Sequence, residues 1–363
     1  MAHSPACITI EGTTYPASAF SPKALPDIAW RSAQHKELAL FLQQWFAPAP
    51  SLTLHTSGST GTPKLLVAEK SRMLHSAAIT CAHLGLHKGH TALLCLSPQY
   101  IAGKMMIVRA IQAGLNLHVA PVSGTPMLEH YGTIDLAAMV PLQVHNGLQN
   151  PHARTHLYAV RHLLVGGGPV PHELVTALTH FPGQAWATYG MTETLSHIAL
   201  RRINGPCQQT GYTPLTGVRV WQTARGTLAL HAPQVCPQEL ETNDIVTLHE
   251  DGSFTIHGRS DNIALCGGLK VQLEEVEALL HPVLGTSFAV TACPHAQLGE
   301  VLVLVSEQPV NQQAVAAPLH PHMRPKHFVV VPALPRTQAS GKIDRTALKQ
   351  LACQTLATQS KVN

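Results

Sequence analysis

The chain has 363 residues, and because a single hydrophobic core rarely grows beyond about 250–300 residues, two domains are expected. Hydrophobic residues make up 45% of it and charged residues only 12%, about half the usual share of roughly 25%. With a formal net charge of +4 and no Lys/Arg run or aromatic-rich RNA motif, the composition excludes an acidic disordered protein and argues against a nucleic-acid binder.

The residue pattern also argues against a membrane or secreted protein. No apolar stretch reaches the ~20 residues that a membrane span needs, and the first residues lack the basic and apolar segments of a secretory signal. The eight cysteines are scattered without a CxxC pair, which favours reduced thiols in a cytoplasmic protein. Two groups of histidines could bind a metal, but neither contains HExxH, so surface histidines in place of Lys or Gln are the favoured interpretation. These groups are His83, His87 and His90, and His152, His156 and His162.

Hydrophobic periodicity predicts alternating strands and helices over the first half of the chain. Strands are predicted at 8–10, 51–55, 91–96, 115–120, 162–165 and 185–189, and helices at 38–45, 73–84, 102–113 and 171–181. This alternation is typical of an α/β layer structure with a mostly parallel sheet.

After about residue 197 the pattern changes to short strands. The segments 227–231 and 245–257 are predicted to be antiparallel, with Asp251-Gly252 as a hairpin turn. The rest of the chain predicts a small α+β domain of about 100 residues that ends in a frayed tail of about ten. Its helix is expected at 274–280 and its strands at 288–291, 301–305 and 328–331.

A loop rich in Gly, Ser and Thr, Thr56-Ser-Gly-Ser-Thr-Gly-Thr-Pro-Lys64, follows the predicted strand 51–55. Glycines let a backbone approach phosphate oxygens, and hydroxyl and N–H groups can donate to them. The spacing fits neither a Walker A loop nor GxGxxG, and a flexible linker is the alternative interpretation. The candidate phosphate ligands are Thr56, Ser57, Gly58, Ser59, Thr60, Gly61 and Lys64.

Two further motifs follow predicted strands. Gly166-Gly167-Gly168-Pro169 would by itself be a plain strand-to-helix turn. In Tyr189-Gly190-Met-Thr192-Glu193-Thr, the Tyr ring can cover a nucleobase, Thr192 can hydrogen-bond a phosphate and Glu193 can hold Mg²⁺. The alternative for the second motif is a capped helix start.

Charged groups mark three later positions. Thr242-Asn243-Asp244 and Gly258-Arg259-Ser-Asp261 place carboxylates and a guanidinium at strand ends, where they suit ribose hydroxyls or form an ordinary exposed hairpin. Ser340-Gly-Lys342 near the C-terminus would by itself be a solvated turn.

Taken together and in this order, these motifs resemble those of the acyl-adenylate-forming superfamily, from about residue 51 to 350. The resemblance implies an ATP- and Mg²⁺-dependent enzyme that activates a carboxylate as an acyl-adenylate and passes it to a thiol, that of coenzyme A. The short segment before Thr56, with the stretch Ser97–Met106, is similar to short bacterial o-succinylbenzoate–CoA ligases of menaquinone synthesis. Leu65, Asn243 and the absence of an aromatic–His pair at Leu94–Pro98 depart from the family's pattern.

The resemblance also implies a role for each motif. Lys342, Thr192 and Glu193 would be catalytic, with Glu193 as metal ligand. The loop from Thr56 to Lys64 would hold phosphates. Gly166, Gly167, Gly168, Tyr189 and Gly190 would frame the adenine, and Asp244 and Arg259 would hold the ribose.

It implies an N-terminal adenylation domain of residues 1–260 and a mobile C-terminal domain of residues 261–363, joined by a hinge at Asp261. After rotation, the stretch Cys266–Lys270, with Gly267 and Gly268, would face the site. If the acid is a dicarboxylate, its second carboxylate needs a buried cation, and Lys104 is favoured over Arg109.

Other functions stay open at this stage. They are another aryl- or acyl-CoA ligase, a stand-alone adenylation domain that loads a carrier-protein thiol, and a nucleotide-binding sensor. The expected partners are the carboxylate, ATP and coenzyme A, with no nucleic acid and no membrane span. The sequence does not predict an oligomeric state.

Overall fold

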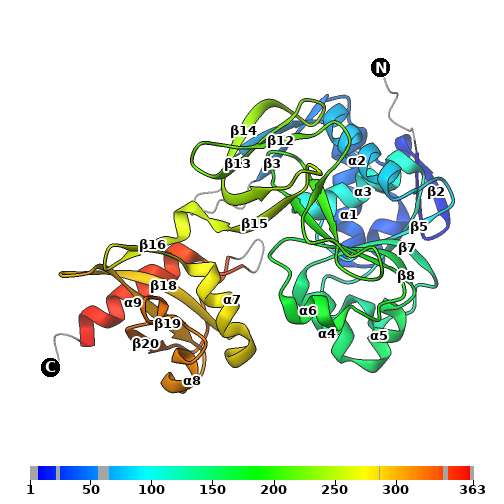
Figure 1. Cartoon of the computed structure of the whole chain (residues 1–363). Helices are drawn as coiled ribbons and strands as arrows, with labels where there is room; N and C mark the ends of the chain where they lie inside the picture. The colour runs from blue at the N-terminus through cyan, green and yellow to red at the C-terminus, as the bar shows by residue number, and fades with distance from the viewer. Residues whose placement is uncertain (1–6, 22–24, 56–64, 286, 338–341, 360–363) are drawn as a thin grey trace.

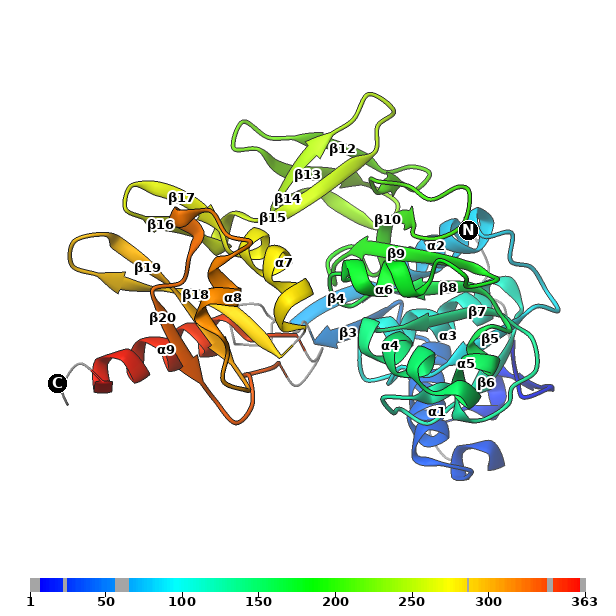
Figure 2. The ribbon, with the colours of Figure 1, turned by 60° about the horizontal axis from the view of Figure 1, so that its bottom comes forward.

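The centre of the molecule is a nine-stranded, mostly parallel sheet (Figures 1 and 2). The computed structural model describes residues 7–21, 25–55, 65–285, 287–337 and 342–359. The strand order is β11-β10-β9-β8-β7-β5-β6-β1-β2, in which the strands from β9 to β1 are parallel and the others antiparallel. The strands are β1 (Cys7–Ile10), β2 (Thr13–Pro16), β5 (Thr91–Leu94), β6 (Asn116–Val119), β7 (Ile134–Met139), β8 (Val160–Val165), β9 (Gln184–Gly190), β10 (His197–Arg202) and β11 (Thr213–Pro214).

Helices cover both faces of this sheet, as predicted for an α/β layer structure. Successive residues of β5, Leu93 and Leu94, are fully buried in two different hydrophobic clusters because strand side chains alternate between faces. One cluster contains residues of α1 (Ala33–Phe46), α2 (Lys70–His83) and α3 (Ile101–Ala113). The other contains residues of α4 (Pro141–Gln149), α5 (Pro151–Leu157) and α6 (His172–Ala177).

Two of these helices, α4 and α5, are absent from the predicted elements, as is β7. Each begins with a proline, Pro141 or Pro151, at the first helical position, where the missing N–H is not needed. The side chain of Asn150 caps α5 by accepting the N–H groups of His152 and Ala153 at 3.0 and 3.1 Å. Pro151 therefore starts a helix here.

Two smaller sheets extend this part of the chain. A four-stranded antiparallel sheet contains the predicted hairpin, with Gly252 at φ 79° in its turn. Its strands are β12 (Arg219–Gln222), β13 (Thr227–Ala232), β14 (Cys236–Leu248) and β15 (Phe254–Arg259). The predicted strand 51–55 forms, but β3 (Ser51–His55) pairs only with β4 (Leu65–Glu69), and the two lie outside the parallel sheet.

The last hundred residues form a lobe of their own (Figure 1, yellow to red). Its five-stranded sheet is covered by α7 (Leu273–Leu284) and α9 (Arg345–Gln359), and α8 (Gln312–Ala316) lies beside it. Every described hydrophobic cluster lies entirely before residue 257 or entirely after residue 263. The boundary between residues 260 and 261 stays a prediction. The strands are β16 (Ile263–Cys266), β17 (Leu269–Gln272), β18 (Phe288–His295), β19 (Gly299–Ser306) and β20 (His327–Val330).

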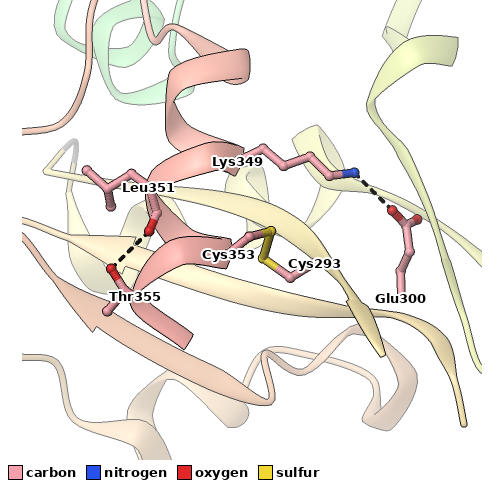
Figure 3. The surroundings of a disulfide bond; sticks show 6 residues. All are labelled: Cys293, Glu300, Lys349, Leu351, Cys353 and Thr355. Carbon is pink, nitrogen blue, oxygen red and sulfur yellow. Dashed lines mark hydrogen bonds and ion pairs between the residues drawn. A yellow bond between two sulfur atoms is a disulfide. The ribbon is translucent and has the colours of Figure 1, made fainter. Parts of the chain in front are cut away.

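A disulfide bond joins Cys293 on β18 to Cys353 on α9, with 5.6 Å between their Cα atoms (Figure 3). The expectation of eight reduced thiols is therefore wrong for this pair, because scattered spacing in the sequence says nothing about which cysteines meet in space. The predicted frayed tail is also shorter than expected. α9 continues to Gln359, and Ala352 on its inner face is fully buried.

Candidate active site

Two of the sequence motifs lie at the carboxyl ends of neighbouring parallel strands. Gly166–Gly168 follows β8 directly, and Tyr189 and Gly190 end β9. Val165 pairs with Ala187 in the parallel ladder between these strands, so both loops begin at the same edge of the sheet. This is the edge at which open α/β sheets bind ligands.

Glycine is required at several of these positions by close backbone approach. A Cβ atom at Gly166 would lie 2.1 Å from the Thr188 hydroxyl oxygen, and one at Gly190 would lie 2.3 Å from the Ser196 carbonyl oxygen. Gly167 has φ of +84°, a conformation that L side chains rarely adopt. The glycines that the sequence offered as ligand contacts therefore also let the two loops fold.

The loop after β9 is held by one buried threonine. The Thr194 hydroxyl accepts the N–H of Met191 at 3.1 Å and donates to the Ser196 carbonyl at 2.8 Å. Leu195 completes the turn in a left-handed conformation with φ of 64°. Thr194 is fully buried, and it is a structural residue that the sequence analysis did not single out. In contrast, Thr192 is half-buried and Glu193 is exposed.

Tyr189 connects this loop to the strand that carries Asp244. Its hydroxyl donates a 2.6 Å hydrogen bond to Asp244 Oδ2, and its ring packs edge-on against Phe254 at 5.3 Å. Burial, and then the charge of Asp244, raise the pKa of Tyr189, so the hydroxyl stays protonated and continues to donate. The carboxylate of Asp244 is thus held in one orientation, with its other oxygen 3.4 Å from Nη1 of Arg259.

Arg259 also holds the residue predicted to be the hinge. Its Nε and Nη2 donate to the two carboxylate oxygens of Asp261 at 2.8 and 2.6 Å. Burial raises the pKa of Asp261, but the bonds and charge of Arg259, together with the bond from Asn243, make the net change downward. Asn243 adds a 3.2 Å bond to Asp261. The sequence analysis treated Asn243 only as a departure from the family's pattern and missed this contact.

Lys342 lies on the same side of the molecule as the glycine turn. A Cβ atom at Gly168 would be 4.0 Å from Cε of Lys342. Burial lowers the pKa of Lys342, the charge of Arg259 adds to this, and Asp244 opposes it. Part of the side chain remains open to solvent. Three other sequence motifs, those of Gly168, Asp244 and Arg259, therefore lie near Lys342.

The phosphate-loop candidates Thr56, Ser57, Gly58, Ser59, Thr60, Gly61 and Lys64 lie outside the described residues. The strands on either side are described, and they pair from Ser51 with Glu69 to His55 with Leu65. The loop therefore connects two paired strand ends.

Gly267 and Gly268 form the turn between β16 and β17, with φ of 57° and 84°. Gly267 donates to the Leu298 carbonyl at 2.9 Å inside the C-terminal lobe. In both whole-chain views this turn points away from α6, which follows the glycine turn at Gly166–Gly168 (Figures 1 and 2). The structure does not bring these two glycines to Lys342.

Lys104 is hydrogen-bonded to the segment just before its own helix, α3. Its ammonium donates to the carbonyls of Pro98 and Gln99 at 2.7 and 2.6 Å and lies 5.9 Å from the centre of the Phe41 ring. Burial lowers its pKa, and the charge of Glu37 opposes this. The ammonium is therefore already hydrogen-bonded within the protein.

Arg109 lies five residues after Lys104 on α3, and its surroundings differ. Only 2% of it is exposed, and burial lowers the pKa of its guanidinium to about 10. Nη2 donates to the Ser196 hydroxyl at the end of the loop after β9. Nε has no hydrogen-bond partner, and no carboxylate within the described ranges pairs with the group. It is a buried cation without a counterion, directly beside the motif loop.

More than half of the chain, residues 23–225, matches the family model described as AMP-binding enzyme. The chain belongs to the AMP-binding enzyme family. A probable 2-succinylbenzoate–CoA ligase of Mycobacterium tuberculosis is 30% identical over 358 residues, covering 87% of this chain and 88% of the relative. A 2-succinylbenzoate–CoA ligase of Listeria monocytogenes is 25% identical over 348 residues, covering 86% of this chain and 73% of the relative.

Solved structures agree with this assignment. An AMP-forming acyl-CoA synthetase/AMP-acid ligase II-like protein of Dyadobacter fermentans is 32% identical with a TM-score of 0.61, covering 89% of this chain and 95% of that one. An o-succinylbenzoate coenzyme A synthetase of Bacillus subtilis, in complex with ATP and magnesium ion, shares the fold at 22% identity and a TM-score of 0.69, covering 82% and 69%. The α/β fold class expected from the sequence is confirmed.

Three observations bear on metals and membranes in this AMP-binding enzyme. Within the described ranges, no group of three or more His, Cys, Asp or Glu side chains is arranged to hold a metal ion. Glu193 makes no hydrogen bond or ion pair with any described residue, so its carboxylate is open to an outside ligand. No described helix is both long and apolar enough to cross a bilayer.

Proposed function

We propose that this AMP-binding enzyme is an ATP-dependent acid–thiol ligase that activates 2-succinylbenzoate as an acyl-adenylate and transfers it to coenzyme A. The reaction would serve menaquinone biosynthesis in the cytoplasm. The observation that carries the chemistry is the approach of Lys342 to Gly168, Asp244 and Arg259. The named relatives in M. tuberculosis and L. monocytogenes support the choice of acid.

In the first step, a substrate carboxylate oxygen attacks the α-phosphorus of ATP and pyrophosphate leaves. Negative charge grows on the phosphoryl oxygens, and the ammonium of Lys342 is a fixed cation aimed at that region. No enzyme nucleophile is needed, because the acid itself attacks. The ammonium of Lys342 is charged only while the pH stays below its pKa. Because that pKa is lowered, this step should be lost at a lower pH than for an ordinary lysine.

The nucleotide would be held by residues of the antiparallel strands β14 and β15 and by the loops after β8 and β9. Asp244, oriented by the hydroxyl of Tyr189, would accept hydrogen bonds from ribose hydroxyls. Arg259 would support it from the other side, although its guanidinium also holds Asp261. The glycine turn at Gly166–Gly168 and the backbone at Gly190 would let adenine approach closely, and the loop from Thr56 to Lys64 would hold the leaving phosphates.

Mg²⁺ fits the free carboxylate of Glu193, since this ion is commonly bound by one or two carboxylates together with substrate phosphates. Bound there, it would neutralise charge on the phosphate oxygens. Thr192, which precedes Glu193 in the same loop, would donate its hydroxyl to a phosphate.

For the second carboxylate of the acid, the contacts favour Arg109 over Lys104. Lys104 already donates to two carbonyls, whereas Arg109 is buried with a free Nε and no counterion. Burying a charge without a partner is costly, and a carboxylate is the natural partner for a guanidinium fork. Arg109 is thus our proposed anchor for the second carboxylate.

The second step is attack of the coenzyme A thiol on the acyl-adenylate. We propose that the lobe after Asp261 rotates, that Lys342 is withdrawn, and that the turn with Gly267 and Gly268 takes its place. The contact of Lys342 with the glycine turn, and the direction of the turn with Gly267 and Gly268 away from α6, support a proposal in which this arrangement precedes the rotation. Small domains joined by a short hinge are expected to move.

The test is pyrophosphate release with ATP, Mg²⁺ and a panel of acids, followed by addition of coenzyme A. The proposal expects release with 2-succinylbenzoate, little release with monocarboxylates such as benzoate, and a thioester once coenzyme A is added. A monocarboxylate preference would make it another aryl- or acyl-CoA ligase. Release without transfer to coenzyme A would indicate a carrier-protein acceptor, and no release with any acid would leave a nucleotide-binding sensor.

A further inference from the structure

Lys342 lies in one of two antiparallel segments, 335–337 and 342–344, which form the two arms of what we call the lysine hairpin. Arg336 and Ile343 form an antiparallel bridge, and Thr337 N donates to the Lys342 carbonyl at 2.8 Å. One residue further, Asp344 N donates to the Pro335 carbonyl at 2.9 Å. The position of the lysine therefore depends on what holds the two arms of this hairpin.

One arm runs directly into α9, and its first residue makes a bidentate ion pair. Nη1 and Nη2 of Arg345 donate to the two carboxylate oxygens of Glu277 on α7, each at 2.7 Å. Nη1 also donates to the Val290 carbonyl on β18 at 3.0 Å, and Glu277 accepts the Val290 N–H at 2.7 Å. Glu277 thus joins α7, β18 and α9 at one point, three residues from Lys342.

The pair is shielded enough to hold a fixed geometry. The exposed fraction of the side chain is 14% for Glu277 and 30% for Arg345. Burial lowers the pKa of Arg345, but the bonds and charge of Glu277 raise it further, so the net change is upward and the guanidinium stays charged. Bidentate charge-assisted bonds are among the stronger and more directional contacts in proteins.

The N-terminal end of α7 is bonded to the strand that carries Arg259. Gln272, just before α7, donates from Nε2 to the Arg259 carbonyl at 2.9 Å. α7 therefore links the strand of Arg259 at one end to the lysine hairpin through Glu277. The second arm of the hairpin is held separately, by Leu334 N donating to Glu307 at 2.9 Å.

We propose that Glu277 and Arg345 are positioning residues that set the place of Lys342 for adenylate formation and that the thioester step does not need them. The proposal rests on the function proposed above. The role is indirect, since the two side chains bond to each other and to the backbone of Val290. Misplacing a catalytic group by about 1 Å can cost on the order of 100-fold in rate, which sets the size of the effect expected for the adenylation step.

The experiment measures both half-reactions in Arg345→Gln, Arg345→Lys and Glu277→Gln. Adenylation is followed by acid-dependent ATP–pyrophosphate exchange, and thioester formation by adding coenzyme A to supplied acyl-adenylate. The matched control is Lys349→Met, because Lys349 makes an ion pair with Glu300 at 3.0 Å from the same helix, one turn further along (Figure 3). Thermal unfolding is recorded for each variant.

The proposal expects Arg345→Gln and Glu277→Gln to lower kcat of exchange with little change in KM for ATP, while thioester formation stays near that of the unchanged chain. Arg345→Lys should recover part of the exchange rate, and Lys349→Met should match the unchanged chain. An exchange rate unaffected in Arg345→Gln, or a parallel fall of both half-reactions, would overturn the positioning role. Absence of exchange in the unchanged chain would instead overturn the proposed function.

Discussion

Lys342 and Gly168 are 174 positions apart in the chain, yet a Cβ atom added at Gly168 would lie 4.0 Å from Cε of the lysine. Gly168 belongs to the turn after β8, and Lys342 to the hairpin before α9. This contact brings the C-terminal lobe onto the edge of the sheet where the other motifs begin. It is the geometry that a lysine would need in order to act on a phosphoryl group held at that edge.

Replacing Tyr189 with Phe should weaken ATP binding. The change removes the 2.6 Å hydrogen bond to Asp244 and leaves that carboxylate free to turn toward Arg259. A hydrogen bond to a charged group contributes about 1.5–3 kcal/mol, so KM for ATP should rise about tenfold or more. Tyr158→Phe, at a residue that packs against the cluster of α4, α5 and α6, is the control and should leave KM unchanged. Equal KM values for both variants would contradict the orienting role of Tyr189.

Arg109→Met should stabilise the protein and weaken binding of the dicarboxylate. It removes a buried cation with no counterion, so the free energy of unfolding should rise, by roughly 1–4 kcal/mol. At the same time KM for the dicarboxylate should rise at least tenfold. Lys104→Met should leave that KM nearly unchanged. If Lys104→Met raised KM and Arg109→Met did not, the choice between the two cations would be reversed.

His162 predicts a loss of stability in acid. Both of its ring nitrogens are buried without a partner among the described residues, and burial, then Arg161, lower its pKa to about 4. Because the folded pKa lies below that of the unfolded chain, stability is full above about pH 6.5 and is lost as the pH falls toward 4. The loss from this residue is about 3 kcal/mol at most.

Urea unfolding at pH 7 and pH 4.5 measures this dependence. His162→Leu should flatten it, whereas His152→Gln, at an exposed position, should not. An unchanged pH dependence in His162→Leu would show that other groups cause the acid sensitivity.

Reducing the disulfide should destabilise the C-terminal lobe. The bond closes a segment of 60 residues between β18 and α9, for which the chain-entropy model gives roughly 4 kcal/mol. The melting temperature should therefore fall on addition of dithiothreitol. A variant with Cys293→Ala and Cys353→Ala should start at the lower value and show no further change. Equal melting curves for both proteins, with and without reductant, would mean that the bond does not contribute.

The sequence predicted those parts of the fold and site that depend on local pattern. Leu93 and Leu94 belong to a continuous apolar run, which predicts a strand buried on both faces. The motifs at Gly166–Gly168 and Tyr189 were identified because each follows such a strand. Their meeting with Lys342 could only be expected from family resemblance, since no local rule links these segments.

What the sequence could not predict depends on contacts between distant residues. Lys104 and Arg109 look equivalent on one helix, and only their surroundings in the fold distinguish them: two carbonyls accept from Lys104, whereas Arg109 is buried with a free Nε. Asn243 gives no sign in the sequence that it binds Asp261. Glu277 and Arg345 are ordinary helix residues in the sequence, and only the fold brings them together beside Val290 on β18. The prolines of α4 and α5 are different, because helix-start chemistry could have revealed them.

The most direct test of the account is acid-dependent ATP–pyrophosphate exchange by Lys342→Ala, compared with thioester formation from supplied acyl-adenylate. Loss of one preorganised group at a developing charge typically costs on the order of 100- to 1,000-fold, so exchange should fall by that much while thioester formation persists. Exchange at the rate of the unchanged chain, or equal loss of both half-reactions, would contradict the assignment of Lys342 to the first step.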